Sequence, residues 1–463
     1  MQKTLIRNAT IITMDPSLGD LHGDILIDGS VIAALGQELP DAGADVIDGR
    51  DSIVVPGFVN AHLHTWQTCM RGIASNWTLP EYLRWIHAGL AEKFSPADIY
   101  ISTLVGALNQ IDCGTTTLVD WCHNNPTPEH TDAAIDALKV AGLRTLFLHG
   151  SPKPDPKSGR RPFWETPHPR SEIERLSNVC KMEEGLLSLG MAILGPHYST
   201  IDVAFHDFEL AREFGLVASM HQGGGPARSP GGWLSLHAAG LLDDRVNIVH
   251  GNDLSDTELE LLMDASATFT TTAESEMICG HGHPIIGRLR ARGHSPSLGS
   301  DIESAVSGDM LTAARMALSH QRSLDNMEAK HAGGVSGKSS IGTREALEWV
   351  TTNGARMTRQ AARIGSLSVG KQADLVMLSS RALNMQPIHD PVSAVVMHAN
   401  PSNVDSVMIA GNWKKRHGRL LHEGLPELME TLNEAGKRII SEMGIGMDDI
   451  HPASNQATPL SRR

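Results

Sequence analysis

Residues 56–65 read PGFVNAHLHT, an apolar run that ends in the triplet His-Leu-His at 62–64. In a strand, residues i and i+2 point to the same face, so both imidazoles can be directed at one metal ion. The triplet alone is a weak motif, because 23 His among 463 residues produce roughly one such pattern by chance. A second triplet, His-Gly-His at 281–283, is flanked by glycine and proline and is an alternative metal pair on a loop. The surrounding sequence therefore has to decide between them.

Short apolar runs alternate with amphipathic stretches after residue 57, as in EHTDAAIDALKVA and TELELLMDA, which have helical spacing. With the opening run there are eight such runs. Strands that alternate with helices form a parallel sheet, and eight of them close a (β/α)8 barrel of the TIM type. The other runs are TTTLVDWC (115–122), GLRTLFLHG (142–150), GMAILGPHY (190–198), GLVASMHQ (215–222), DRVNIVHGN (244–252), SATFTTT (266–272) and SPSLGSD (295–301).

The two ends of the chain show short alternating strands separated by turn residues, which predict a small sheet. TLIRNATIIT, DILIDGSVIAAL and DVIDGRDSIVV precede the barrel runs, and GSLSVGKQADLVMLS and SVMIAGNWKKRHGRLL follow them. We therefore expect an α/β protein with three parts. Residues 57–365 form the barrel, residues 1–56 and 366–425 form a composite β-sandwich, and residues 426–463 form a C-terminal helix and a flexible tail.

Composition excludes several classes of partner. Lys and Arg total 39 against 53 Asp and Glu, for a formal charge of −14, so no basic surface is expected to bind nucleic acid. No apolar run is long enough to cross a bilayer, and the N-terminus lacks the apolar core of a signal peptide. The five cysteines are irregularly spaced and contain no Cys-x-x-Cys pair. We expect reduced thiols in a cytoplasmic protein, with neither disulfides nor a thiolate metal site.

Polar residues occupy the ends of most predicted barrel strands, where a barrel gathers its ligands and catalytic groups. A lone histidine is more often a core or surface residue with a backbone partner. Several on successive strand ends instead favour a site, and three imidazoles with one carboxylate suit a divalent ion that keeps an open water position. Besides the opening pair, these residues are His149, His197, His221, His250 and Asp301.

The combination PGFVNAHLHT, ASMH, IVHGND, PSLGSD and GSLSVGKQADLVML resembles the amidohydrolase superfamily, in the branch with cytosine deaminase, guanine deaminase and the triazine hydrolases. The similarity extends over nearly the whole chain. It implies one divalent metal ion bound by His62, His64, His221 and Asp301, with His250 beside it polarising the substrate.

The resemblance also bears on the number of metal ions. Members with two metals carry a carboxylated lysine at the end of the fourth strand, whereas this strand ends GPHYST. We expect one ion per subunit, zinc first, with iron, cobalt and manganese also compatible with the ligands. The nearest lysines, Lys153 and Lys157, lie in a Pro-rich loop and are expected to be solvated. Many relatives are homo-oligomers, and we expect the same here.

Two departures from the deaminases concern proton transfer. Those enzymes have His-x-x-Glu at the fifth strand, and the Glu shuttles a proton to the substrate, but this chain has Gly224 at that position. After the seventh strand, Glu274 and Glu276 stand near the place where relatives have Asn. Either Glu is a candidate substrate contact or proton path. The alternative is that both face solvent or pair with Arg288 or Arg290.

A mechanism follows from the groups that remain. A bound ion lowers the pKa of its water, Asp301 takes and returns the proton, and His250 stabilises the oxyanion. This chemistry favours a small neutral substrate with a linear C–N bond: an amide, a urea such as a phenylurea, or a (thio)carbamate as cleaved by molinate-type hydrolases. The first alternative is a deaminase or chlorohydrolase acting on a pyrimidine, purine or triazine ring. The second is a catalytically inactive barrel used for binding.

Further substrate contacts are expected around the same strand ends. Gln67 follows the metal pair in HLHTWQTCMRG, a run that resembles the family's first loop, and is a candidate to face the substrate. His197 matches a position that contacts substrate in relatives, and Glu276 is the third candidate. Arg71 could equally brace the first loop. Four tryptophans near the first two strands could line a pocket, although core packing is the commoner role for each: Trp66, Trp77, Trp85 and Trp121.

Overall fold

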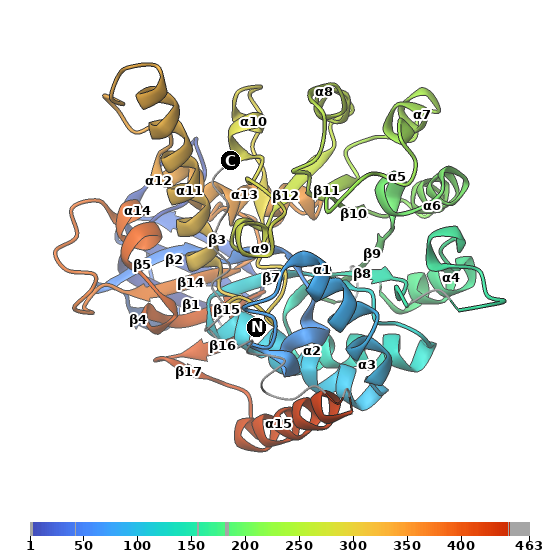
Figure 1. The fold of residues 1–463 in the computed structure, drawn as a ribbon. Coiled ribbons are helices and arrows are strands. Elements are labelled where there is room, and N and C mark those ends of the chain that lie inside the picture. Colours follow the sequence, from blue (N-terminus) through green and yellow to red (C-terminus); the bar gives the residue numbers. More distant parts are fainter. Residues whose placement is uncertain (1–2, 42, 155–156, 181–184, 443, 445–463) are drawn as a thin grey trace, which may run out of the picture.

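The computed structural model describes residues 3–41, 43–154, 157–180, 185–442 and 444. These residues form two sheets, one of eight strands and one of nine. Helices surround the eight-stranded sheet, and the nine-stranded sheet lies to one side of it, built from the two ends of the chain, blue and orange in Figure 1.

The eight-stranded sheet is a parallel barrel, as predicted. Its strands follow the chain order from β6 to β13, and every neighbouring pair is parallel. A parallel bridge between Leu63 and Asp301 joins the last strand to the first and closes the ring. The strands are β6 (Phe58–Leu63), β7 (Thr115–Cys122), β8 (Arg144–Gly150), β9 (Leu187–Ala192), β10 (Ala218–Gln222), β11 (Val246–His250), β12 (Thr268–Thr271) and β13 (Ser297–Leu298).

Seven of the eight predicted apolar runs contain one of these strands and the fourth overlaps one, because barrel strands are buried on both faces and read as continuous apolar segments. All residues of β6, β7 and β8 are buried. The fourth run differs from the prediction, since β9 ends at Ala192 and a short helix, α5 (Gly195–Tyr198), follows. Pro196 is suited to the first turn of a helix and cannot continue a ladder. His197 therefore lies on a helix and not at a strand end.

The helices that connect the strands begin and end at ordinary signals. Ser95 caps the helix Pro96–Asp112, where its hydroxyl accepts a hydrogen bond from the Asp98 amide at 3.4 Å. Gly142, with a φ of 65°, ends the helix Pro128–Ala141. The helices are α1 (Leu79–Tyr82), α2 (Pro96–Asp112), α3 (Pro128–Ala141), α4 (Arg170–Val179), α6 (Ile201–Glu213), α7 (Gly232–Ala238), α8 (Asp256–Asp264), α9 (Ala273–Cys279), α10 (Ile286–Arg290), α11 (Met310–His331), α12 (Thr343–Trp349) and α13 (Thr352–Met357).

The nine-stranded sheet has the order β17-β16-β15-β14-β5-β1-β2-β3, with β4 paired to β1. It joins the N-terminal and C-terminal segments, as predicted, through the antiparallel pair β5 and β14. The run DVIDGRDSIVV is divided into two strands at Gly49. The strands are β1 (Lys3–Ile11), β2 (Leu21–Asp28), β3 (Val31–Gly36), β4 (Asp45–Asp48), β5 (Ser52–Pro56), β14 (Leu375–Ser379), β15 (Val404–Ile409), β16 (Asn412–Arg416) and β17 (Arg419–Leu420).

The predicted C-terminal helix is α15 (Leu425–Ser441), which packs Leu432 and Ala435 against Ile101 and Val105 of α2. The tail expected after it lies outside the described residues. All five cysteines are free. Within the part of the chain that the structure describes, no helix is long and apolar enough to span a membrane.

Candidate metal centre

Four side chains converge at the C-terminal end of the barrel. His62 lies in β6, His64 directly follows that strand, His221 comes from β10, and Asp301 follows β13. One ligand atom from each lies within 4.8 Å of the others. The His62 Nε2 atom is 3.2 Å from Nε2 of His221 and 3.3 Å from the Asp301 Oδ1 atom, which is 3.5 Å from Nε2 of His64.

This geometry fits a single ion. Ligands at 2.0–2.1 Å in a tetrahedron are about 3.3 Å apart, close to the separations observed here. Two imidazole nitrogens that face each other and a carboxylate oxygen at such distances make a donor set that a divalent cation satisfies. Burial lowers the pKa of His64 to about 3 and also lowers the pKa values of His62 and His221, so all three rings are neutral and able to coordinate.

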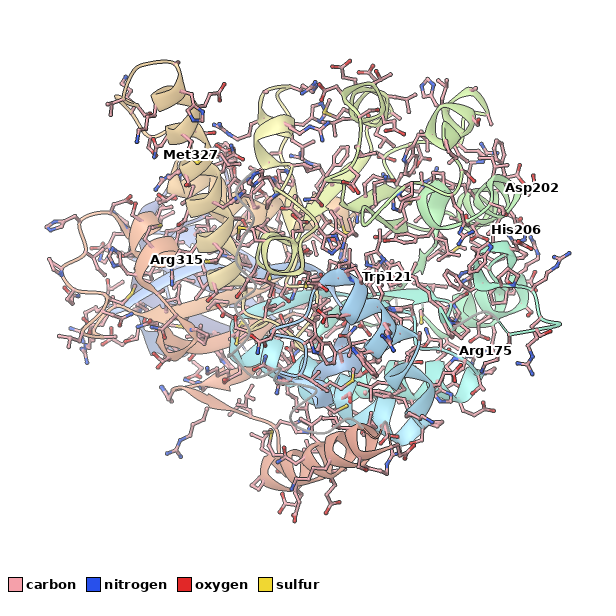
Figure 2. All side chains as sticks on the ribbon, in the orientation of Figure 1. Trp121, Arg175, Asp202, His206, Arg315 and Met327 are labelled. Carbon is pink, nitrogen blue, oxygen red and sulfur yellow. The ribbon has the colours of Figure 1, made fainter. Side chains whose placement is uncertain are left out.

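The backbone around the ligands fixes their directions. The Nδ1 atom of His64 lies 2.6 Å from the carbonyl of Trp121, which leaves Nε2 for the ion. Trp121, labelled near the centre of Figure 2, lies beside His221 with ring centroids 4.3 Å apart. The Asp301 amide donates to the His62 carbonyl and the His64 amide to the Asp301 carbonyl, both at 2.9 Å.

Gly299 permits this close contact between the last strand and the first. A Cβ atom at residue 299 would lie 2.6 Å from the carbonyl oxygen of His62, so no larger residue fits. Asp301 and His250 both have left-handed backbone angles, with φ of 65° and 68°. Such conformations are costly for residues other than glycine and concentrate at functional sites.

His250 ends β11 and stacks on His221, with ring centroids 5.4 Å apart and planes at 23°. Its Nδ1 atom lies 3.2 Å from Oε1 of Glu276, which is fully buried on α9. Burial alone would lower the pKa of His250, but the bond to Glu276 and the Asp301 carboxylate outweigh burial and raise it. Glu276 is thus the partner that orients His250, a partner that the sequence did not identify.

The alternative that Glu276 faces solvent or pairs with an arginine is wrong for this residue. Arg288 binds Asp256, and Arg290 binds Glu345. Glu274 is partly buried, and burial raises its pKa.

The cavity beside the ligand cluster is lined by His64, His221 and Asp301 and has a volume of about 40 Å³. None of the three predicted substrate contacts lines it. Glu276 lies behind His250; Gln67 binds Tyr82 and Ser304 at 2.6 and 2.7 Å. Lining residues that the sequence did not identify as site residues include Leu79, Tyr82, Leu83, His87, Tyr198 and Ile302.

Tyr198 directly follows His197 in GPHYST. The sequence therefore predicted the correct segment, but Tyr198 lines the cavity and His197 does not. His197 instead lies 3.1 Å from the Gln222 amide nitrogen. Arg71 braces the first loop through a 2.6 Å ion pair with Glu303. His149 lies 2.9 Å from His168 and does not line the cavity.

The expectation that both loop lysines are solvated is wrong for Lys153. Its side chain lines the cavity, and burial lowers its pKa to about 8. Lys157 is exposed and pairs with Glu92 at 2.9 Å, as a solvated lysine does. The two residues differ because Lys153 is close to the end of β8, whereas Lys157 lies farther along the loop.

Leu79 and Tyr198 occupy the space that a side chain at residue 224 would need. Its φ is 91°, and a Cβ atom there would lie 2.8 Å from Leu79 and 3.2 Å from the Tyr198 hydroxyl. The Tyr198 hydroxyl donates to the Gly223 carbonyl at 2.5 Å. A glutamate side chain at residue 224 would need both neighbours to move.

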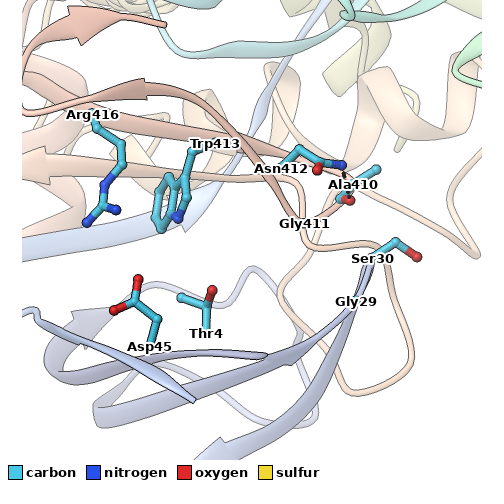
Figure 3. Close-up of a pocket in the computed structure, with 9 residues that line it drawn as sticks. All are labelled: Thr4, Gly29, Ser30, Asp45, Ala410, Gly411, Asn412, Trp413 and Arg416. Atoms are coloured by element: carbon cyan, nitrogen blue, oxygen red, sulfur yellow. Dashed lines mark hydrogen bonds between the residues drawn. The ribbon is translucent and has the colours of Figure 1, made fainter. Parts of the chain in front are cut away.

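The second histidine triplet does not form a comparable centre. His281 lines the cavity, but His283 lies 3.0 Å from His320 at the surface. Another cavity, of about 400 Å³, lies in the nine-stranded sheet domain, where Figure 3 shows Trp413 and Arg416 on one side and Asp45 on the other. Histidine and cysteine are missing from the described residues that line it, so it lacks the donors of the barrel site.

Comparisons with known proteins agree with this architecture. The model of the amidohydrolase family matches residues 53–414. The chain is 28% identical over 451 residues to a 5-methylthioadenosine/S-adenosylhomocysteine deaminase of Acetivibrio thermocellus, with 94% of this chain and 99% of that protein covered. It is 25% identical over 467 residues to a 5'-deoxyadenosine deaminase of Methanosarcina mazei, with 96% and 100% covered.

Two solved structures have the same fold. An atrazine chlorohydrolase from Arthrobacter aurescens, complexed with zinc, superimposes with a TM-score of 0.82 at 22% identity, covering 94% of this chain and 100% of that chain. An adenosine deaminase from Xanthomonas campestris with bound zinc gives a TM-score of 0.78 at 22% identity, covering 95% and 99%. With the barrel and its ligand cluster, these matches show that the chain belongs to the amidohydrolase family and is a metal-dependent hydrolase of carbon–nitrogen bonds.

Proposed function

We propose that this enzyme hydrolyses the bond between a nitrogen heteroaromatic ring and an exocyclic nitrogen, as in a purine, pyrimidine or triazine. The similarity to two enzymes named as deaminases of adenosine derivatives, over at least 94% of this chain, carries the proposal. It favours the ring substrate over the linear amide, urea or (thio)carbamate that the missing Glu at residue 224 suggested.

In this proposal His62, His64, His221 and Asp301 hold one zinc ion. When bound, the ion supplies a Lewis acid and lowers the pKa of water. The solved relatives that contain zinc support this choice of metal. The close approach of the four ligand atoms supports a mononuclear site.

Asp301 is proposed as the group that takes a proton from water and returns it to the leaving nitrogen. Its Oδ2 atom accepts from the Ser275 hydroxyl at 2.6 Å, so the carboxylate is held in one orientation. The neighbouring histidines and their hydrogen bond keep its pKa well below the usual range despite burial. The carboxylate is therefore ionised and ready to accept a proton at neutral pH.

His250 is proposed to contact the reacting group of the substrate. Its Nδ1 atom is directed at Glu276, so Nε2 is the nitrogen left for the substrate. A pre-oriented imidazole beside the ligands can stabilise charge that develops during addition to the ring.

A second cavity adjoins the small cavity beside the metal ligands. His87 lines the small cavity and also a neighbouring cavity of about 650 Å³. The larger cavity has apolar walls that include Phe94 and Phe163, with Arg160 and Arg161 also among its lining residues. We propose that it accommodates a ring substituent.

A substrate screen tests this function. Zinc-loaded enzyme is assayed with adenosine, 5'-methylthioadenosine and an aminotriazine, and in parallel with a phenylurea and a thiocarbamate, by following released ammonia or amine. Release from a ring is the expected result, and Asp301→Asn serves as the inactive control. Release from the urea or thiocarbamate alone would overturn the proposal.

A further inference from the structure

Lys153 has an unusual position in the loop after β8. It stands between two prolines, and Pro152 and Pro154 line the larger cavity while Lys153 lines the cavity at the metal ligands. Proline restricts its own φ angle and the backbone of the residue before it. The segment therefore presents a single cationic side chain to the proposed reaction site and apolar rings to the neighbouring space.

The ammonium of Lys153 is held by aromatic faces. Its Nζ atom lies 4.9 Å from the ring centroid of Tyr198 and 5.6 Å from that of Trp121. Both distances are within the range of cation–π contacts. In the described part of the chain, no carboxylate lies within ion-pair distance of this Nζ atom and no hydrogen bond is made by it. An ammonium has three donors, so donors remain for a molecule in the cavity.

The Tyr198 side chain lies next to both Lys153 and Gly224. The Tyr198 hydroxyl lies 3.2 Å from the position that a Cβ atom at residue 224 would take, and the Lys153 ammonium rests on the face of that ring. The His-x-x-Glu pattern to which the sequence was compared would place a carboxylate at residue 224, in this neighbourhood. Here a phenol fills part of that space, and the nearby charge is positive.

We propose that Lys153 contacts the substrate directly and donates a charge-assisted hydrogen bond to an acceptor on the heterocycle, so that the site favours an anionic ring over a neutral one. This inference rests on the proposed ring hydrolysis and narrows its substrate class. An ammonium can only donate, whereas a carboxylate also accepts. A charge-assisted hydrogen bond in a partly dry cavity is among the stronger polar contacts.

Binding of two pyrimidines to the zinc-loaded enzyme tests the inference without turnover. Barbiturate is an anionic trioxo ring at neutral pH, and uracil is a neutral dioxo ring. Wild type is expected to bind barbiturate more tightly by calorimetry. Lys153→Met should weaken barbiturate binding about 10- to 100-fold, the loss expected for a hydrogen bond to a charged group, and should change uracil binding less.

Two further variants separate contact from packing. Lys153→Arg keeps the charge and should retain barbiturate affinity within about tenfold of wild type, since guanidinium also donates to oxygen. Lys157→Met removes the exposed lysine of the same loop and should change nothing. Equal barbiturate affinity in wild type and Lys153→Met, or wild type that prefers uracil, would overturn the inference. Neither result concerns ring turnover, so a failure of the proposed function shows separately in the substrate screen.

Discussion

Two buried polar clusters lie at opposite ends of the barrel strands and differ in how their charged groups are paired. At the N-terminal end, Arg144 of β8 donates from Nε and Nη2 to the two carboxylate oxygens of Asp374 at 2.7 and 3.0 Å. The Ala410 amide adds a bond of 2.7 Å to Asp374. At the C-terminal end, three imidazoles and Asp301 face one another with acceptors directed inward. The first cluster already pairs a cation with an anion, although Nη1 of Arg144 has no hydrogen-bond partner among the described residues, and the second needs a cation.

The difference follows from position in the barrel. The N-terminal ends of the strands meet the nine-stranded sheet, so a bidentate ion pair there joins two parts of the fold. The C-terminal ends carry loops that can vary without disturbing the barrel. Left-handed backbone angles occur in both clusters, at Ala410 in the first and at Asp301 and His250 in the second. The balance of charge therefore distinguishes the two clusters. A guanidinium already faces the carboxylate in the structural cluster, whereas the functional cluster consists of three imidazoles and a carboxylate.

The largest expected effect comes from Asp301, which combines two roles. Asp301→Asn removes a negatively charged ligand and the proposed proton acceptor, so metal content should fall and kcat/KM should drop by about 10²- to 10⁴-fold or more. Metal analysis and a rate assay on the same preparation measure both effects. His283→Ala, which changes only the surface pair with His320, should keep the ion. An Asp301→Asn protein with full metal and an unchanged rate would contradict the assignment.

The next effect concerns stability. Asp374→Ala leaves a buried guanidinium without its partner, which should destabilise the fold by about 3–5 kcal/mol in urea unfolding. The metal content of the protein that remains folded should stay unchanged. The double variant Arg144→Met/Asp374→Leu should recover part of the stability, because it removes both charges. If Asp374→Ala lost metal with no change in stability, the two clusters would not have the separate roles inferred here.

Much of the fold and of the ligand set could be predicted from sequence, because both depend on local pattern. Barrel strands such as β7 and β8 are continuous apolar runs, and residues at their C-terminal ends are read directly from the run. His221, His250 and Asp301 were found in this way and do lie together in the structure.

The residues that surround the ligands could not be found in this way. Glu276 on α9 meets His250 at the end of β11 through the tertiary fold, and no local spacing encodes this contact. Lys153 looked like a solvated loop residue, since PKPDPK has no apolar periodicity, and its burial depends on Trp121 and Tyr198 from other segments. Loop positions set by tertiary contacts leave no periodic signal in the chain.

A smaller effect is expected from the partner of His250. Glu276→Gln keeps the shape but removes the charge that raises the pKa of His250, so kcat/KM should fall about 10- to 100-fold with metal retained. The pH profile should change as well, because the folded-state pKa of His250 should shift downward. Glu274→Gln on the same helix is the matched control and should leave the profile unchanged. If the pH profile of Glu276→Gln were the same as that of wild type, Glu276 would not be the residue that positions His250.

The smallest expected effect is a decrease in barbiturate affinity as the pH rises and Lys153 loses its charge. Burial lowers the pKa of Lys153 to about 8, so its positive charge is present below that pH and is lost as the pH rises through it. Barbiturate affinity should then fall by up to about tenfold per pH unit above 8. Tyr198 does not contribute, since burial raises its pKa to about 12. The other titratable groups lining the cavity are His64, His87, His221, His250, His281, Tyr82, Cys279 and Asp301.

These other groups remain in the Lys153→Met variant, so the difference between its profile and that of wild type isolates the lysine. His250 is the one group among them whose raised pKa can bring a second limb toward neutrality, and that limb should persist in Lys153→Met. Lys153→Arg should move the limb near pH 8 upward, because guanidinium stays charged at higher pH. If the loss of affinity near pH 8 persisted in Lys153→Met, it would arise from another titrating group, and Lys153 would not be the source of the positive charge that binds barbiturate.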